Sequence, residues 1–82
     1  MAKSFHLTIA RIGEKLFDGA ATHATFPGRE GVFTVLAHHE PLVAELKKGE
    51  VEIESADGST QRFLVPQTGV VEVSNNQATV LL

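Results

Sequence analysis

The four histidines are the residues of this sequence best suited to metal binding or acid–base chemistry. His38 and His39 are adjacent and precede Glu40, so two imidazoles and a carboxylate lie within three residues. Neighbouring side chains of an extended strand point to opposite faces, so His38 and His39 are poorly placed to share one ion. We therefore expect no metal site, and we interpret these histidines, together with His6 and His23, as surface or interface residues.

Patterns typical of nucleophilic catalysis and of phosphate binding are missing from the sequence. Cysteine and tyrosine are absent, and no serine lies in a Gly-x-Ser-x-Gly pattern. The stretch from Pro27 to Gly31 holds two glycines, but it fits neither phosphate-loop pattern, and the carboxylate of Glu30 would repel a phosphate. We interpret Gly28 and Gly31 as turn residues, and we expect no catalytic residue, no nucleotide site and no cofactor.

A regular alternation of carboxylates and apolar residues occurs at positions 50–54. Glu50, Glu52 and Glu54 share one face of an extended strand, and Val51 and Ile53 share the other. The simplest interpretation is a solvated face over a core face, with no acid–base role for the glutamates.

Short runs rich in valine, isoleucine and threonine, separated by turn residues, are the elements that must position these side chains. The opening run places Phe5, Leu7 and Ile9 on one face, which predicts a half-buried strand. Asp57-Gly58 and Asn75-Asn76 are typical of hairpin turns, and we also expect turns at Asp18-Gly19 and Pro27-Gly28. The candidate strands cover residues 5–10, 15–17, 20–26, 32–36, 42–46, 51–55, 61–65, 70–74 and 78–82.

The fold class predicted from this pattern is all-β. No apolar stripe with helical spacing persists for 10 to 12 residues, so we expect no helix. About nine to ten short strands favour a two-layer antiparallel β-sandwich, or flattened barrel. With 82 residues in total, we expect the whole chain, 1–82, to be one domain.

Charge and composition make several classes of partner poor candidates. The formal net charge of −3 supplies no basic field for nucleic acid or anionic lipid. No apolar run reaches the roughly 18 to 20 residues that span a bilayer, so we expect no direct membrane insertion. The absence of cysteine argues against a small secreted scaffold, so we expect a cytoplasmic protein.

One ordered set of motifs resembles a known family. Residues 26–36, Phe-Pro-Gly-Arg-Glu-Gly-Val-Phe-Thr-Val-Leu, followed by His39-x-Pro41-Leu42, are similar to the β-sandwich domain of the epsilon subunit of the rotary ATP synthase. The resemblance continues, in register, in four other segments: residues 5–9, 15–19, 46–53 with Asp57-Gly58 at the next turn, and 72–81.

The resemblance implies a non-catalytic rotor subunit in the central stalk of an F-type ATP synthase, which couples c-ring rotation during proton transport to ATP synthesis or hydrolysis. The partners implied are the gamma subunit, the c ring and, indirectly, the catalytic alpha/beta head. The complex would lie on the inner face of the cell membrane. Another open interpretation is a stand-alone β-sandwich module that binds a small ligand or another protein.

The same resemblance assigns residues to two partner-facing surfaces. The c-ring-facing loop would be Pro27, Gly28, Arg29, Glu30 and Gly31, and the gamma-facing residues would be His39, Pro41 and Leu42.

The sequence departs from the family pattern at four places. The family usually has Pro-Gly where this sequence has Ala37-His38, and Glu40 takes the place of a common alanine. Pro66-Gln67-Thr68-Gly69 is one residue longer than the usual Ser-Gly-Gly. The two-helix hairpin that follows the sandwich in many members is absent from these 82 residues, so we expect coupling without the inhibition that the hairpin can exert.

Overall fold

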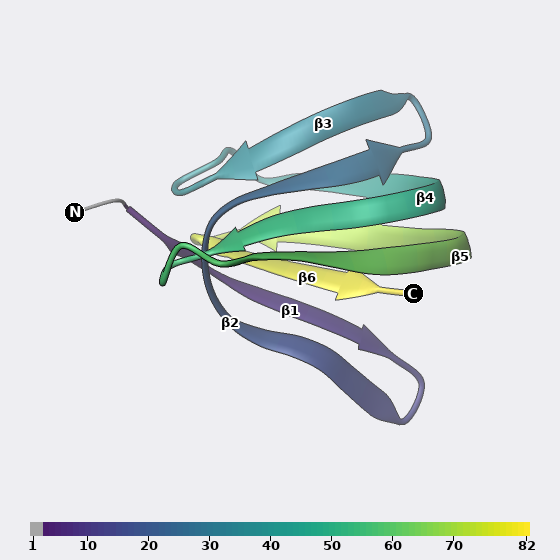
Figure 1. Ribbon diagram of the computed structural model, residues 1–82. Helices are drawn as coiled ribbons and strands as arrows, with labels where there is room; N and C mark the ends of the chain where they lie inside the picture. The colour runs from purple at the N-terminus through teal and green to yellow at the C-terminus, as the bar shows by residue number, and fades with distance from the viewer. Residues whose placement is uncertain (1–2) are drawn as a thin grey trace.

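The computed structural model describes residues 3–82 as strands joined by short connections (Figure 1). Within these residues the six strands are β1 (Phe5–Arg11), β2 (Glu14–Gly28), β3 (Gly31–Leu36), β4 (Leu42–Ser55), β5 (Thr60–Ser74) and β6 (Gln77–Leu81). The all-β fold class is thus confirmed.

Three of the strands are long and bend, and each holds two of the predicted segments. β2 contains residues 15–17 and 20–26, β4 contains 42–46 and 51–55, and β5 contains 61–65 and 70–74. The register shifts between Lys47 and Gly49 of β4, where an irregularity interrupts the pairing with β5. The turn predicted at Asp18-Gly19 is wrong, because both residues pair with β1 inside β2.

The bends divide the strands between two layers. One layer contains β3, residues 21–28 of β2, residues 49–55 of β4 and residues 60–65 of β5. The other contains residues 14–21 of β2, then β1, β6, residues 69–74 of β5 and residues 42–47 of β4. The strand order β1-β6-β5-β4-β2-β3, with β1 also paired to β2, confirms the sandwich, or flattened barrel.

One pairing departs from the predicted antiparallel arrangement. β1 and β6 run parallel, with His6 opposite Gln77 and Ala10 opposite Leu81. Alternation of side chains indicates which face of a strand is buried, but it carries no information about the direction of the neighbouring strand.

The core lies between the two layers and is almost wholly aliphatic. Phe5, Leu7 and Ile9 are buried as predicted, and Val51 and Ile53 are buried beneath the glutamate face. The other buried apolar residues are Ala21, Ala24, Phe26, Val35, Leu46, Val65, Val71, Val73, Ala78 and Val80. Packing between the buried faces of the two layers holds the strands in place. The strands in turn position the connections, and the candidate site lies in these connections.

Candidate functional site

The β2–β3 hairpin carries the predicted c-ring-facing residues. Gly28 pairs with Gly31, so the connection between the strands consists of Arg29 and Glu30 alone. Pro27 and Gly28 are buried, whereas Arg29, Glu30 and Gly31 are exposed. Only the last three are available for contact with another molecule.

Gly28 has a structural role that its neighbours impose. A Cβ atom at this position would lie 2.5 Å from the carbonyl oxygen of Gly31 and 2.8 Å from the ring of Phe33. That ring in turn packs on Phe26, with ring centroids 5.4 Å apart. The hairpin can therefore turn tightly over the aromatic pair only with glycine at position 28.

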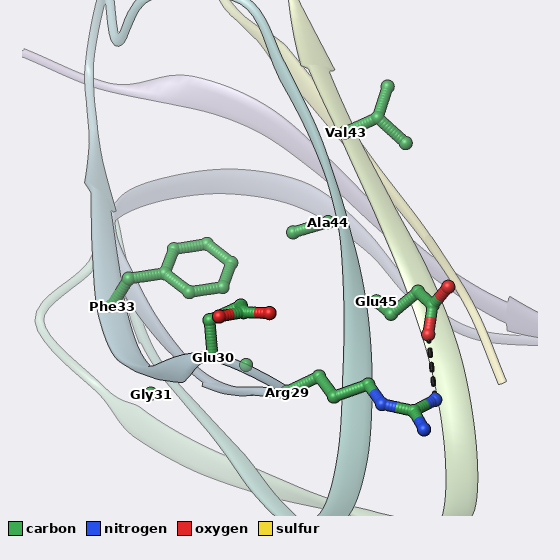
Figure 2. Close-up of a pocket in the computed structure, with 8 residues that line it drawn as sticks. Arg29, Glu30, Gly31, Phe33, Val43, Ala44 and Glu45 are labelled. Atoms are coloured by element: carbon green, nitrogen blue, oxygen red, sulfur yellow. Dashed lines mark hydrogen bonds and ion pairs between the residues drawn. The ribbon is translucent and has the colours of Figure 1, made fainter.

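Two hydrogen bonds join the hairpin to β4. The Arg29 N–H donates to the carbonyl oxygen of Glu45 at 2.9 Å. The Arg29 Nη1 donates to the Glu45 Oε2 at 2.9 Å, as Figure 2 shows. The guanidinium is thus already paired within the chain, although both side chains remain largely exposed to solvent.

Glu30 differs from Arg29 in its surroundings. Within residues 3–82 no ion pair is formed by Glu30, and its carboxylate lies beside an open groove of about 580 Å³. Phe33 and Ala44 line the groove on either side of Glu30 (Figure 2). Since the charges of Arg29 and Glu45 offset each other, the groove carries the single negative charge of Glu30.

The connection between β3 and β4, residues 37–41, lies at the other end of β3 and is named here the connecting segment (Figure 1). The His39 N–H donates to the carbonyl oxygen of Leu36 at 3.2 Å. His39 Nδ1 lies 2.7 Å from the Glu40 carbonyl oxygen, which can only accept, so Nδ1 is the protonated nitrogen. Among the predicted gamma-facing residues, Pro41 is exposed, His39 is half-buried, and Leu42 packs partly against the core.

The importance of Asn76 was missed by the sequence analysis, which interpreted Asn75-Asn76 only as a turn. Both residues have positive φ, +51° and +59°, as that interpretation requires. In addition, the Asn76 Oδ1 accepts a hydrogen bond from the His38 N–H at 2.7 Å. The φ of His38 is +61°, so the departure from the family's glycine falls on left-handed backbone.

The remaining histidines form separate cross-strand pairs. His6 Nε2 lies 2.5 Å from Asp18 Oδ1, and His23 Nε2 lies 3.2 Å from Glu54 Oε2. Hydrogen bonds from Lys15 and His6, in that order of effect, lower the pKa of the Asp18 carboxyl. In the part of the chain that the structure describes, no cluster of three or more potential metal ligands occurs.

The glutamates of β4 behave as the alternation predicts. Glu50 and Glu52 are exposed above buried Val51 and Ile53, and Glu54 is half-buried. Glu52 pairs with the facing Arg62 at 2.7 Å. Across residues 3–82 there is no helix with the length and apolar character needed to cross a membrane.

The arrangement of strands defines the class of protein. It is a small β-sandwich whose β2–β3 and β3–β4 connections lie at opposite ends of β3. Residues 4–82 match the family described as "ATP synthase, Delta/Epsilon chain, beta-sandwich domain". The chain belongs to this family.

Relatives and a solved structure agree with the family. The chain is 36% identical over 78 residues to the ATP synthase epsilon chain of Delftia acidovorans, covering 95% of this chain and 56% of the relative. It is 37% identical over 79 residues to the epsilon chain of Chlorobium limicola, covering 96% and 89%. A chain in the F1/c-ring structure of the Euglena gracilis mitochondrial ATP synthase superposes with a TM-score of 0.87 at 25% identity, covering 95% of this chain and 49% of that chain.

The relatives differ in length. The chain spans about half the length of several curated relatives that it matches, as with the Delftia acidovorans protein at 56%. It spans 89% of the Chlorobium limicola protein.

Proposed function

We propose that the chain is a non-catalytic rotor component in the central stalk of a proton-transporting ATP synthase. The observation that carries the proposal is the match of residues 4–82 to the delta/epsilon sandwich family. In this role residues 1–82 act as one domain, which joins the gamma subunit to the c ring and reaches the catalytic alpha/beta head only through gamma. The domain lies on the inner face of the membrane as part of the complex.

The two candidate surfaces support this role by their positions. The hairpin and the connecting segment lie at opposite ends of β3 (Figure 1). Five residue steps separate Gly31 from Leu36, which at about 3.3 Å per residue gives roughly 16 Å. β3 is paired along its whole length with β2, and Val35 packs in the core. A load applied at one end is therefore transmitted through a paired and packed element.

The hairpin is proposed to face the c ring through Glu30. Because Arg29 is paired with Glu45, the charge that remains for a partner is negative. A basic side chain of the partner would complement it, with the apolar walls of Phe33 and Ala44 beside its aliphatic part.

The connecting segment is proposed to face gamma through His39 and Pro41. Leu42 contributes mainly by anchoring this end of β4, because it packs against the core and pairs with Val73.

Two charge reversals at the two ends test the proposal. Glu30→Lys and Glu40→Lys make the same change at exposed positions, one in the hairpin and one in the connecting segment. We expect Glu30→Lys to reduce recovery of the c ring and Glu40→Lys to reduce recovery of gamma. The measurement is affinity purification of the tagged subunit from its native membranes in mild detergent, with quantitative mass spectrometry of what co-elutes.

The unmutated subunit is the control for both variants. Recovery of gamma and the c ring by the unmutated subunit, with the two variants affecting different partners, supports the rotor role. Recovery of neither partner by a folded, unmutated subunit contradicts it and leaves the stand-alone binding module as the better interpretation.

A further inference from the structure

The Asn76 side chain and backbone join three parts of the chain that are distant in sequence. Its Oδ1 accepts from the His38 N–H at 2.7 Å, in the connecting segment. Its Nδ2 donates to the Ser4 carbonyl oxygen at 3.0 Å, and its own carbonyl oxygen accepts from the His6 N–H at 3.2 Å. The β5–β6 turn is thereby tied both to the start of β1 and to the connection between β3 and β4.

The connecting segment needs such a tie because of its backbone conformation. The φ of His38 is +61°, in the left-handed region that a residue with a Cβ rarely occupies. Within residues 3–82, one other backbone N–H of the connecting segment has a hydrogen-bond partner: the His39 N–H donates to the Leu36 carbonyl oxygen at 3.2 Å. The bond to Asn76 is the shorter of the two and is the one that connects the segment to a different strand pair.

Asn76 is well suited to act as the fixed partner. Its φ of +59° lies in the left-handed region, which asparagine tolerates better than most residues. The residue is half-buried between β5 and β6, which are paired from Val70 to Leu81. Its amide oxygen is consequently presented to His38 by a turn that exists independently of the connecting segment.

We propose that Asn76 is a positioning residue, which holds the connecting segment in the conformation that presents His39 and Pro41 to a partner protein. The inference rests on the proposed function in taking gamma as that partner. A segment that is ordered before binding loses less conformational entropy on association. The hydrogen bond from His38 to Asn76 should therefore increase the affinity of the subunit for gamma.

The neighbouring residue supplies a matched control. Asn75 has a similar φ of +51° and belongs to the same turn, but it is exposed, and no side-chain hydrogen bond of Asn75 is recorded among residues 3–82. Glycine retains the left-handed backbone at either position, so Asn76→Gly and Asn75→Gly differ chiefly in the loss of the amide group. Asn76→Asp keeps an oxygen for the His38 N–H and removes the donor to Ser4.

The experiment combines amide hydrogen exchange on the full subunit with surface plasmon resonance against purified gamma. We expect Asn76→Gly to lower the protection of the His38 amide and to raise the dissociation constant for gamma by about tenfold, the usual effect of one net hydrogen bond. Asn75→Gly should leave both quantities within about twofold of the unmutated subunit, and Asn76→Asp should retain the protection of His38.

If Asn76 only stabilises the fold, Asn76→Gly will have a lower melting temperature, but its affinity for gamma, measured well below that temperature, will be unchanged. Such a result, or equal effects of the two glycine variants, would overturn the inference. If the unmutated subunit fails to bind gamma, the proposed function is wrong. This outcome can be distinguished from failure of the Asn76 inference, because hydrogen exchange at His38 is measured without gamma.

Discussion

Replacing Gly28 by alanine tests whether the hairpin is built around a missing side chain. The added Cβ would lie 2.5 Å from the Gly31 carbonyl oxygen and 2.8 Å from two carbon atoms of the Phe33 ring. The Phe33 ring cannot move away freely, because it packs on buried Phe26. The backbone must shift instead, which would also displace Arg29 from Glu45.

The size of the effect follows from these contacts. Overpacking a well-packed site costs about 1–3 kcal/mol, and we expect the upper value, about 3 kcal/mol, because a backbone oxygen and a ring are both in the way. For a domain of this size each kcal/mol lowers the melting temperature by about 4–8 °C, so Gly28→Ala should lower it by roughly 12–24 °C. Circular dichroism during heating, together with urea unfolding, measures both quantities.

Gly19→Ala is the control, since it makes the same substitution in the same strand. A Cβ at Gly19 would meet the Phe17 ring at 3.6 Å, an ordinary contact, and its φ is not in the left-handed region. We expect no loss of stability there, and a gain of about 0.4–1 kcal/mol from the less flexible unfolded chain. Equal stability of the two variants would refute the argument that steric contacts fix glycine at position 28.

Two further predictions concern charged pairs. Asp18→Asn should lower the free energy of unfolding at neutral pH, because hydrogen bonds from Lys15 and His6 depress the pKa of Asp18 below its ordinary value of 3.8. A depressed pKa adds stability above pH 3.8, and this is lost as the pH falls through the folded-state value, so the two unfolding curves should converge in acid. The ion pair between Arg29 and Glu45 can be tested with a double-mutant cycle of Arg29→Glu and Glu45→Arg. The double variant, which restores opposite charges, should regain part of the unfolding free energy that each single variant loses, about 0.2–1 kcal/mol for an exposed pair. Additive effects of the two substitutions would argue against the ion pair.

The strand segments could be predicted because alternation and turn chemistry are local properties of the sequence. Each predicted segment lies within a strand, except that the last extends one residue beyond β6, and the burial of Phe5, Leu7 and Ile9 follows directly from their spacing. The fusion of segments into bent strands was not predictable in the same way. It depends on which strands pair with the two halves of each bent strand: the first half of β2 pairs with β1, and the second half pairs with β3 and β4.

The candidate site was only partly accessible from the sequence. The hairpin was located by its glycines, but burial of Pro27 depends on Gly49, whose added Cβ would lie 2.9 Å from the proline side chain. The pairing of Arg29 with Glu45 spans 16 residues, and the bond of Asn76 to His38 spans 38. No periodicity links such positions, so their side-chain contacts had to come from the fold.

The parallel pairing of β1 with β6 has a consequence for the biogenesis of the protein. β6 lies between β1 and β5, and its partners in β1 precede it by about seventy residues, as with His6 and Gln77. One layer of the sandwich is therefore incomplete until the end of β6 has left the ribosome, and a nascent chain that stops earlier exposes the open edges of β1 and β5. Because unpaired strand edges favour aggregation, we expect chains that stop before β6 to aggregate more readily than the full chain.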